Sequence, residues 1–231
     1  MSALLTIYHP ERILVAADSL LQTTDDYERG NITGTATVQK LFVIPSAFTV
    51  ITACGHSTCG AKSVRTILME FAKTLPLIIS HPEFVSEFSH YILSYFPSMK
   101  TDFHLSGFHQ GEAFVYDFDR FKESHTVPVR KNLDRFGRPT ASVLGFCDSS
   151  TTQWCISANP NFWSMSDHQI KDFLFEFFRK EVEIARRKKI PDVAEPIDVV
   201  QLDSTSIRPL QLHNPVLAFI RQRNDANTGG I

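Results

Sequence analysis

The sequence predicts an α+β protein in which two antiparallel β-sheets are stacked between layers of helices. The order of the elements is the first observation: short strands come first, two helices follow, and further strands, a long helix and a late strand complete the chain. The second observation is that each predicted helix carries its apolar residues along one face, as a helix packed on a sheet does. The third is that no internal repeat, low-complexity tract or linker divides the chain.

The chain begins with a predicted hairpin. Residues 4–8 and 13–15 are β-rich runs, and His9, Pro10 and Glu11 between them favour a turn. The segment 20–37 that follows is polar and contains glycine, so it is predicted to be a loop or a loose hairpin.

Strands at 40–44 and 48–52 precede two predicted helices. The first helix covers 61–75, and the second begins at Pro82, a residue that the first turn of a helix tolerates. Both have apolar residues at helical spacing, which predicts one buried face on each. The residues that form these two stripes are Val64, Ile67, Leu68, Phe71 and Leu75, and then Phe84, Val85, Phe88, Tyr91, Ile92 and Tyr95.

The next elements are predicted strands. Residues 103–108 and 112–118 form a hairpin about Gln110-Gly111, a strand lies near 124–129, and the turn-rich segment 132–140 is a connector.

The longest helix is predicted at 166–189, where Ser166 and Gln169 match a capping box. The basic run at its end, 186–189, is interpreted as a solvated last turn that complements the helix dipole. Residues 197–202 read as a late buried strand.

The composition is that of an ordinary globular protein. The chain has 231 residues, of which 43% are hydrophobic and 21% charged, and its net charge of −2 gives no reason to expect a nucleic-acid or anionic-membrane partner. No apolar run reaches the roughly 20 residues needed to span a bilayer. Four cysteines without a leader peptide indicate free thiols in the cytoplasm. We expect one domain over residues 1–203 and a C-terminal extension or tail over 204–231.

The N-terminus carries a candidate nucleophile. The residue after Met1 is Ser2, whose small side chain permits removal of the initiator methionine. Ser2 then has a hydroxyl and an α-amine on one residue. Because an α-amine has a pKa of about 8, a large minority of it is neutral near pH 7 and can accept the hydroxyl proton. This chemistry needs no histidine, and we expect neither a cofactor nor a metal.

Three landmarks after Ser2 resemble the proteasome β-subunit and HslV-like family of N-terminal nucleophile (Ntn) hydrolases, including its divergent bacterial homologues. They are the interval from Ser2 to Asp18, the Lys-Leu-Phe opening of the strand at Lys40, and Gly55 ten residues before Arg65. The resemblance implies a four-layer αββα sandwich.

The resemblance also implies a role for four residues. Ser2 falls where the family has its nucleophile, Asp18 where it has the carboxylate that orients a lysine, Lys40 where it has that lysine, and Gly55 where a backbone N–H forms the oxyanion hole. The implied function is peptide-bond hydrolysis inside a homo-oligomeric ring or stack of rings. Peptides or unfolded proteins are the implied substrates, and an ATP-dependent unfoldase is a candidate partner.

The sequence departs from the family pattern at several positions. Serine replaces the family's threonine, so the side chain lacks the methyl group that restricts its rotamer. The family's carboxylate late in the long helix is expected near 185–188, where this chain has only alanine and basic residues, and Asp192 lies nearby in a loop. A family serine near the nucleophile's amine corresponds to Ser142 or Ser149, and the sequence does not choose between them. Helix capping is the alternative role of Asp148 and Ser149.

Two segments have open interpretations. Residues 20–37 are longer than the family segment that borders the substrate cleft, so they shape specificity, cover a neighbouring subunit, or form an ordinary surface loop. The segment from Ser204 lies against a neighbouring subunit or is a frayed terminus.

Other functions are retained as alternatives. The chain is a catalytically inactive ring-forming subunit if the site has been lost, or an amidase acting on a small molecule. Cys54 beside His56 is an alternative nucleophile, on the expectation that a helix N-terminus lowers its pKa. A metal site would draw on Cys54, His56, Cys59, His104 and His109, but their spacing matches no zinc pattern.

Overall fold

The structure is a computed structural model that describes residues 3–26, 31–120, 127–188, 193 and 196–211. Its first sheet has five antiparallel strands in the order β12-β1-β2-β13-β14. The predicted N-terminal hairpin and the predicted late strand are both confirmed, and the structure shows them as neighbours in this sheet. The strands are β1 (Leu4–His9), β2 (Arg12–Asp18), β12 (Ser142–Phe146), β13 (Ile197–Asp203) and β14 (Ile207–Gln211).

The second sheet is also five-stranded and antiparallel, in the order β11-β10-β9-β6-β5. The predicted hairpin about Gln110-Gly111 joins β9 to β10, and both turn residues have positive φ, 51° and 80°, as a tight hairpin turn requires. The strands are β5 (Leu41–Ile44), β6 (Thr49–Gly55), β9 (Thr101–His109), β10 (Glu112–Phe118) and β11 (Val129–Arg130), with a short 3-10 helix η1 (Pro45–Ala47) between β5 and β6.

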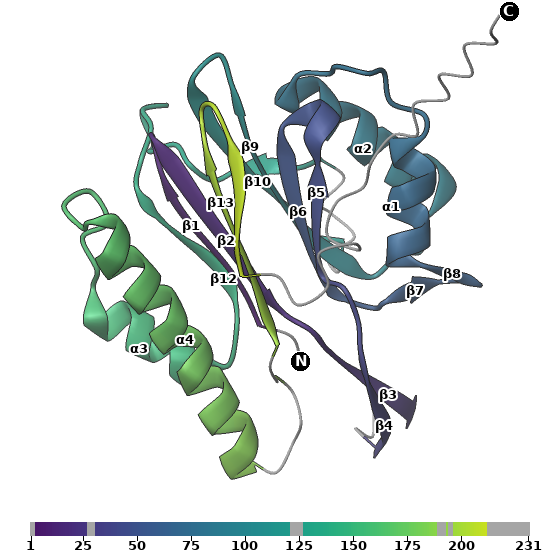
Figure 1. The fold of residues 1–231 in the computed structure, drawn as a ribbon. Coiled ribbons are helices and arrows are strands. Elements are labelled where there is room, and N and C mark those ends of the chain that lie inside the picture. The colour runs from purple at the N-terminus through teal and green to yellow at the C-terminus, as the bar shows by residue number, and fades with distance from the viewer. Residues whose placement is uncertain (1–2, 27–30, 121–126, 189–192, 194–195, 212–231) are drawn as a thin grey trace, which may run out of the picture.

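Within the described part of the chain, four α-helices complete the layers. Helices α1 (Val64–Ala72) and α2 (His81–Tyr95) cover the second sheet, and α3 (Ser149–Ala158) and α4 (Asp167–Lys188) cover the first (Figure 1). The two sheets face each other between these layers, so the predicted αββα sandwich of two antiparallel sheets between helices is confirmed.

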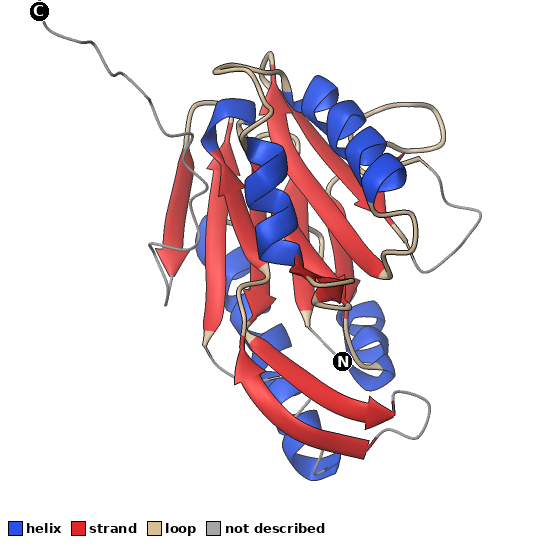
Figure 2. Ribbon diagram, turned by 90° about the vertical axis from the view of Figure 1, so that its right-hand side faces the viewer, coloured by secondary structure: helices blue, strands red, loops and turns tan. Residues whose placement is uncertain are grey.

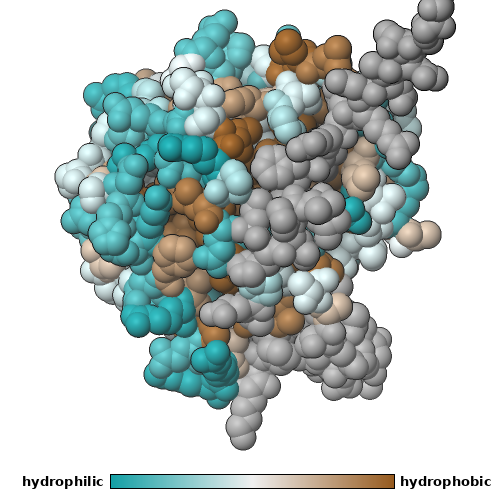
Figure 3. Space-filling model, viewed as in Figure 1, coloured by the Kyte–Doolittle hydropathy of each residue, from teal (hydrophilic) through white to brown (hydrophobic). Residues whose placement is uncertain are grey.

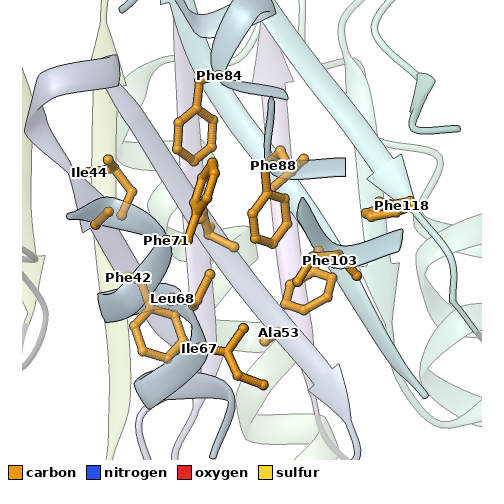
Figure 4. Packing of buried hydrophobic residues seen from close by; sticks show 14 of the residues in the cluster. Phe42, Ile44, Ala53, Ile67, Leu68, Phe71, Phe84, Phe88, Phe103 and Phe118 are labelled. Atoms are coloured by element: carbon orange, nitrogen blue, oxygen red, sulfur yellow. The ribbon is translucent and has the colours of Figure 1, made fainter. Parts of the chain in front are cut away.

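Three hydrophobic clusters hold the four layers together, one in each interface between layers. The cluster under α1 and α2 is rich in phenylalanine: Phe88 contacts Phe71, Phe84 and Phe103, with ring centroids 5.1 to 6.0 Å apart (Figure 4). Aromatic pairs at this spacing add to the stabilisation that burial provides. Nine of its nineteen buried residues belong to the apolar stripes that predict the two helices.

Two small hairpins lie outside the main sheets. The described residues of the segment 20–37 form β3 (Leu20–Asp26) and β4 (Asn31–Thr37), which pair with each other and project from the body (Figure 2). The sequence predicted a loop or a loose hairpin here, and the antiparallel pairing of β3 with β4 agrees with the hairpin. The second pair is β7 (Thr58–Cys59) and β8 (Lys62–Ser63). Because β8 ends at Ser63, whose side chain caps the Thr66 N–H, α1 begins at Val64 and not at Ala61.

Several boundaries differ from the prediction. The strand expected near 124–129 corresponds to β11 (Val129–Arg130). Residues 121–126 of the expected region lie outside the described part of the chain. The predicted capping box is confirmed, because Ser166 N donates to Gln169 Oε1 at 2.8 Å and Gln169 N donates to Ser166 Oγ at 3.4 Å. The segment from Ser204 contributes β14 to the first sheet, and residues 212–231 lie outside the description.

The surface in the view of Figure 1 is mixed. Hydrophilic side chains dominate its left side, where the α3–α4 layer lies, and hydrophobic side chains gather toward its middle (Figure 3). Among the described residues, no helix is both long enough and apolar enough to cross a membrane.

Candidate active site

Asp18 and Lys40 meet between the two sheets. Asp18 ends β2 of the first sheet, and Lys40 immediately precedes β5 of the second. The Lys40 Nζ donates to Asp18 Oδ1 at 2.8 Å, and the two side chains are 6% and 0% exposed. The Lys40 carbonyl also accepts from Ala53 N at 2.9 Å, which fixes its backbone beside β6. The structure therefore brings together two predicted site residues that are 22 positions apart in the sequence.

The same carboxylate is bonded to the beginning of the described chain. Ala3 N donates to Asp18 Oδ1 at 2.9 Å, and Asp18 N donates to the Ala3 carbonyl at 3.1 Å. Leu20 N donates to the second oxygen, Oδ2, at 3.0 Å. The predicted nucleophile Ser2 lies outside the described residues, and Ala3 is its neighbour in the chain. One carboxylate oxygen thus holds both the lysine and the residue that follows Ser2.

The electrostatic balance at Asp18 combines two opposing effects. Burial raises the pKa of its carboxyl, because water no longer solvates the charged form, while Lys40 and the N–H groups of Ala3 and Leu20 act in the opposite direction. A buried carboxylate needs such partners, and here the described structure supplies three of them.

Gly55 lies at the end of β6, beside the same pair. Its φ of 112° is open to glycine and rarely adopted by L side chains, so the bend at the strand end explains this glycine without reference to chemistry. Successive N–H groups alternate in direction along a strand. Because Ala53 N bonds to Lys40 O and His56 N bonds to Lys100 O, strand alternation puts the Gly55 N–H on the Lys40 side of β6.

A pocket of about 370 Å³ opens at this point. Its lining comes from the segment before β5, the end of β6, the start of β9, the β7–β8 hairpin and the first turn of α1. The residues are Thr37, Val38, Gln39, Lys40, Ala53, Cys54, Gly55, His56, Ser57, Thr58, Ser63, Val64, Arg65 and Thr101. Lys40 and Gly55 are therefore both accessible to one concave space of the size of a small ligand site.

The sequence-based prediction missed a buried carboxylate on α4. Glu181 is 4% exposed, and its two carboxylate oxygens accept from Asp148 N at 3.2 Å each. Burial raises the pKa of Glu181, and the charges of Asp148 and Asp18 act in the same direction. The signal that could have found it is its spacing: Glu181 lies four residues after Phe177 and four before Ala185, on the apolar face of the helix.

Lys188 occupies the part of α4 where the resemblance led us to expect a carboxylate. Its Nζ pairs with the side chain of Asp148, which also caps α3 by accepting from Ser150 N at 2.9 Å. The capping role considered for Asp148 is confirmed. Asp192 lies outside the described residues.

The two serines left open by the sequence lie in different places. Ser142 is opposite Tyr8 in the β1–β12 ladder, whereas the Asp18 end of β1 is at Leu4, four residues away along the strand. Ser149 begins α3 directly after Asp148, whose backbone contacts Glu181. The structure therefore separates Ser142 from the Asp18–Lys40 pair.

Cys54 lies in a different setting from the one we expected. It is 3% exposed and belongs to the hydrophobic cluster between the sheets. Because α1 begins at Val64, Cys54 is not at a helix N-terminus, and the expected reason for a lowered thiol pKa is wrong. Within the described residues, no group of three or more histidine, cysteine or acidic side chains is placed to hold a metal.

The two antiparallel sheets stacked between helical layers match the proteasome-like Ntn fold. The structure is similar to Anbu from Hyphomicrobium sp. strain MC1, with a TM-score of 0.63, 10% sequence identity and coverage of 93% of this chain and 90% of that one. A Gly-1 mutant of the same protein gives a TM-score of 0.63, 11% identity, and coverage of 94% and 90%. The sequence matches no family profile and no curated protein. The likeness is one of fold.

Proposed function

We propose that this protein is an Ntn hydrolase that cleaves peptide bonds with Ser2 as its nucleophile after Met1 is removed. The observation that carries the proposal is the sharing of Asp18 Oδ1 between Lys40 Nζ and Ala3 N, at 2.8 and 2.9 Å. This arrangement holds a buried ammonium next to the residue that follows Ser2. An ammonium beside an N-terminal residue favours the neutral amine and stabilises an alkoxide.

The reaction begins with attack of Ser2 Oγ on the peptide carbonyl. The α-amine of Ser2 accepts the hydroxyl proton, directly or through a water, and the Gly55 N–H donates to the oxyanion that forms. A donor of this kind contributes about 3 kcal/mol to transition-state stabilisation. The protonated amine then gives its proton to the leaving amine, and an acyl-enzyme ester remains. Water, activated by the same amine, hydrolyses the ester and restores Ser2.

In this proposal Asp18 is a positioning residue. It compensates the buried charge of the Lys40 ammonium and holds its Nζ in place through the ion pair at 2.8 Å. A homo-oligomeric ring, peptide or unfolded-protein substrates and an ATP-dependent unfoldase belong to the same proposal, since the family resemblance implies them.

The experiment uses intact mass spectrometry and a peptide epoxyketone, which reacts with a hydroxyl and an amine on one residue. We expect a protein without Met1, one covalent adduct per chain that maps to Ser2, and no adduct in Ser2→Ala. Lys40→Met is expected to prevent the adduct. Lys62→Met is the matched control, since Lys62 is exposed and pairs with Glu70 away from Asp18.

The second candidate function is an inactive ring-forming subunit, and Lys188 favours it because a lysine stands where the resemblance implies a carboxylate. Retention of Met1 with no adduct supports this candidate over the hydrolase. Turnover of small amides without turnover of peptides supports an amidase. An adduct on Cys54 identifies Cys54, and not Ser2, as the nucleophile.

A further inference from the structure

We propose that the pocket beside Lys40 and Gly55 selects an acidic side chain on the acyl side of the scissile bond, and that Arg65 is the residue that sets this preference. The inference rests on the proposed function, because it assigns the pocket to the substrate residue that is attacked. It concerns the charge of the pocket, which can be tested separately from the chemistry of Ser2.

The lining of the pocket has an uneven charge. Its fourteen described lining residues include the basic side chains Lys40 and Arg65, together with His56, and among them there is no aspartate or glutamate. The charge of Lys40 is compensated by Asp18 at 2.8 Å. The positive charge that remains for a bound group is therefore that of Arg65.

Arg65 is exposed in the first turn of α1, and no described carboxylate pairs with it. Glu70 is the acidic residue nearest in sequence on the same helix. Its Oε2 is already paired with Lys62 Nζ at 2.6 Å. The first turn of a helix also carries a partial positive charge, which acts in the same direction as the guanidinium. Both contributions favour an anionic group over a cationic one.

The apolar part of the lining suits the stem of such a side chain. Val38, Ala53 and Val64 line the pocket together with Arg65, so methylene groups meet apolar atoms while a terminal carboxylate meets the guanidinium. Arginine recognises carboxylates well because its planar fork donates two parallel hydrogen bonds. Glutamate and aspartate side chains combine these two features.

Binding tests the proposal without cleavage. Isothermal titration of the Ser2→Ala protein is performed with three acetylated tripeptide amides, Ala-Ala followed by glutamate, glutamine or lysine. An exposed charge pair contributes up to about 1 kcal/mol, so we expect the glutamate peptide to bind about fivefold more tightly than the glutamine peptide. The lysine peptide is expected to bind most weakly.

Arg65→Glu is the informative variant, because an acidic residue is favourable in the first turn of a helix and should not disturb folding. It is expected to reverse the order of the three peptides. Lys73→Glu makes the same charge change at the other end of α1, where Lys73 is the C-cap, and should keep the wild-type order.

The outcomes separate this inference from the proposed function. Equal binding of the three peptides, no binding, or an order unchanged by Arg65→Glu overturns the charge preference. Hydrolysis of peptides by the Ser2 protein with no acidic preference leaves the proposed function standing and rejects the inference. If the glutamate peptide binds most tightly, Arg65→Glu reverses the order, and no adduct forms on Ser2, the charge preference stands and the proposed function is rejected.

Discussion

The carboxylate of Asp18 and the ammonium of Lys40 form a buried ion pair that joins the last residue of β2 to the residue before β5, and thereby one sheet to the other. Such a pair has a structural role whether or not it has a catalytic one, since each partner compensates the buried charge of the other. The two roles can be separated by substitution.

Asp18→Asn leaves the Lys40 charge buried without a counterion, so we expect a loss of about 3 to 5 kcal/mol in the free energy of unfolding. The double variant Asp18→Asn/Lys40→Met removes both charges and keeps an oxygen that accepts from Ala3 N. It is expected to recover most of the stability and none of the hydrolysis, measured by urea denaturation and peptide turnover. Turnover by the double variant at the wild-type rate contradicts a catalytic role for the pair.

Glu181→Gln removes a buried charge while keeping an acceptor for the Asp148 N–H. The charge of Asp18 raises the pKa of Glu181, so the two carboxyls become fully ionised at a higher pH than Asp18 alone, and Glu181→Gln removes that later step. We expect the acid limb of the pH–rate profile to move to lower pH. Glu183→Gln is the control, since Glu183 is exposed and pairs with Arg187. Identical profiles for Glu181→Gln and wild type contradict the coupling.

Asp102 gives the protein a pH-dependent stability. Burial raises the pKa of Asp102 to about 7, and a hydrogen bond with Asp119 and the charge of Asp119 act in the same direction. The folded protein therefore holds a proton that the unfolded chain releases near pH 4, so this contribution is present at low pH and is lost as pH rises toward 7 and above.

Asp102→Asn is expected to remove that dependence while keeping the acceptor for Arg120 N, which lies at 3.0 Å. Relative to the variant, the wild-type protein should lose about 2 kcal/mol of stability between pH 5 and pH 8. At the higher pH Asp102 is ionised and adds a second buried negative charge beside that of Asp119. Thermal unfolding at both pH values measures the difference. A wild-type-minus-variant difference that stays constant with pH contradicts the raised pKa.

Gly107→Ala is expected to destabilise the second sheet by at least about 2 kcal/mol, as overpacking of a core does. An added Cβ would lie 2.4 Å from His81 Nδ1 and 2.8 Å from the Phe48 carbonyl. His81 cannot easily move, because it is fully buried and its Nδ1 lies 2.6 Å from Thr49 Oγ1. Ser106→Ala on the same strand is the control, since the Ser106 hydroxyl has no hydrogen-bond partner within the described structure. Equal midpoints in urea for the two variants contradict the steric argument.

The elements with the strongest periodicity were predictable from the sequence. Each of these elements buries one face or both, so its apolar residues recur at the spacing of a helix or a strand. The helices are α1, α2 and α4, and the strands are β1, β2 and β13. Helix α3 has no such signal, because Thr151 is its one buried residue. Strand β12 contains Gly145, where an added Cβ would lie 3.2 Å from Leu5 Cδ1, so a tertiary contact explains a residue that strands otherwise disfavour.

The part of the candidate site that could be predicted is the part whose residues follow the family's order along the chain. Asp18 and Lys40 meet as the resemblance implied, although their catalytic roles stay a prediction. Glu181 was not found, because the resemblance directs attention to 185–188, one to two turns later on α4, and not to an acid on the apolar face. The contact of Glu181 with Asp148 depends on how α4 packs beside α3, which a linear spacing does not encode.

The projecting β3–β4 hairpin has a consequence for how the protein responds to its neighbours. Its two strands leave the body at Ser19 and Val38, which are joined by a hydrogen bond of 2.7 Å, and Asp18 and Lys40 lie within two residues of these points. The β3–β4 pair is therefore connected to the body directly beside the Asp18–Lys40 ion pair. A neighbouring molecule that binds β3 or β4 contacts the segment that continues into the two residues joining the sheets.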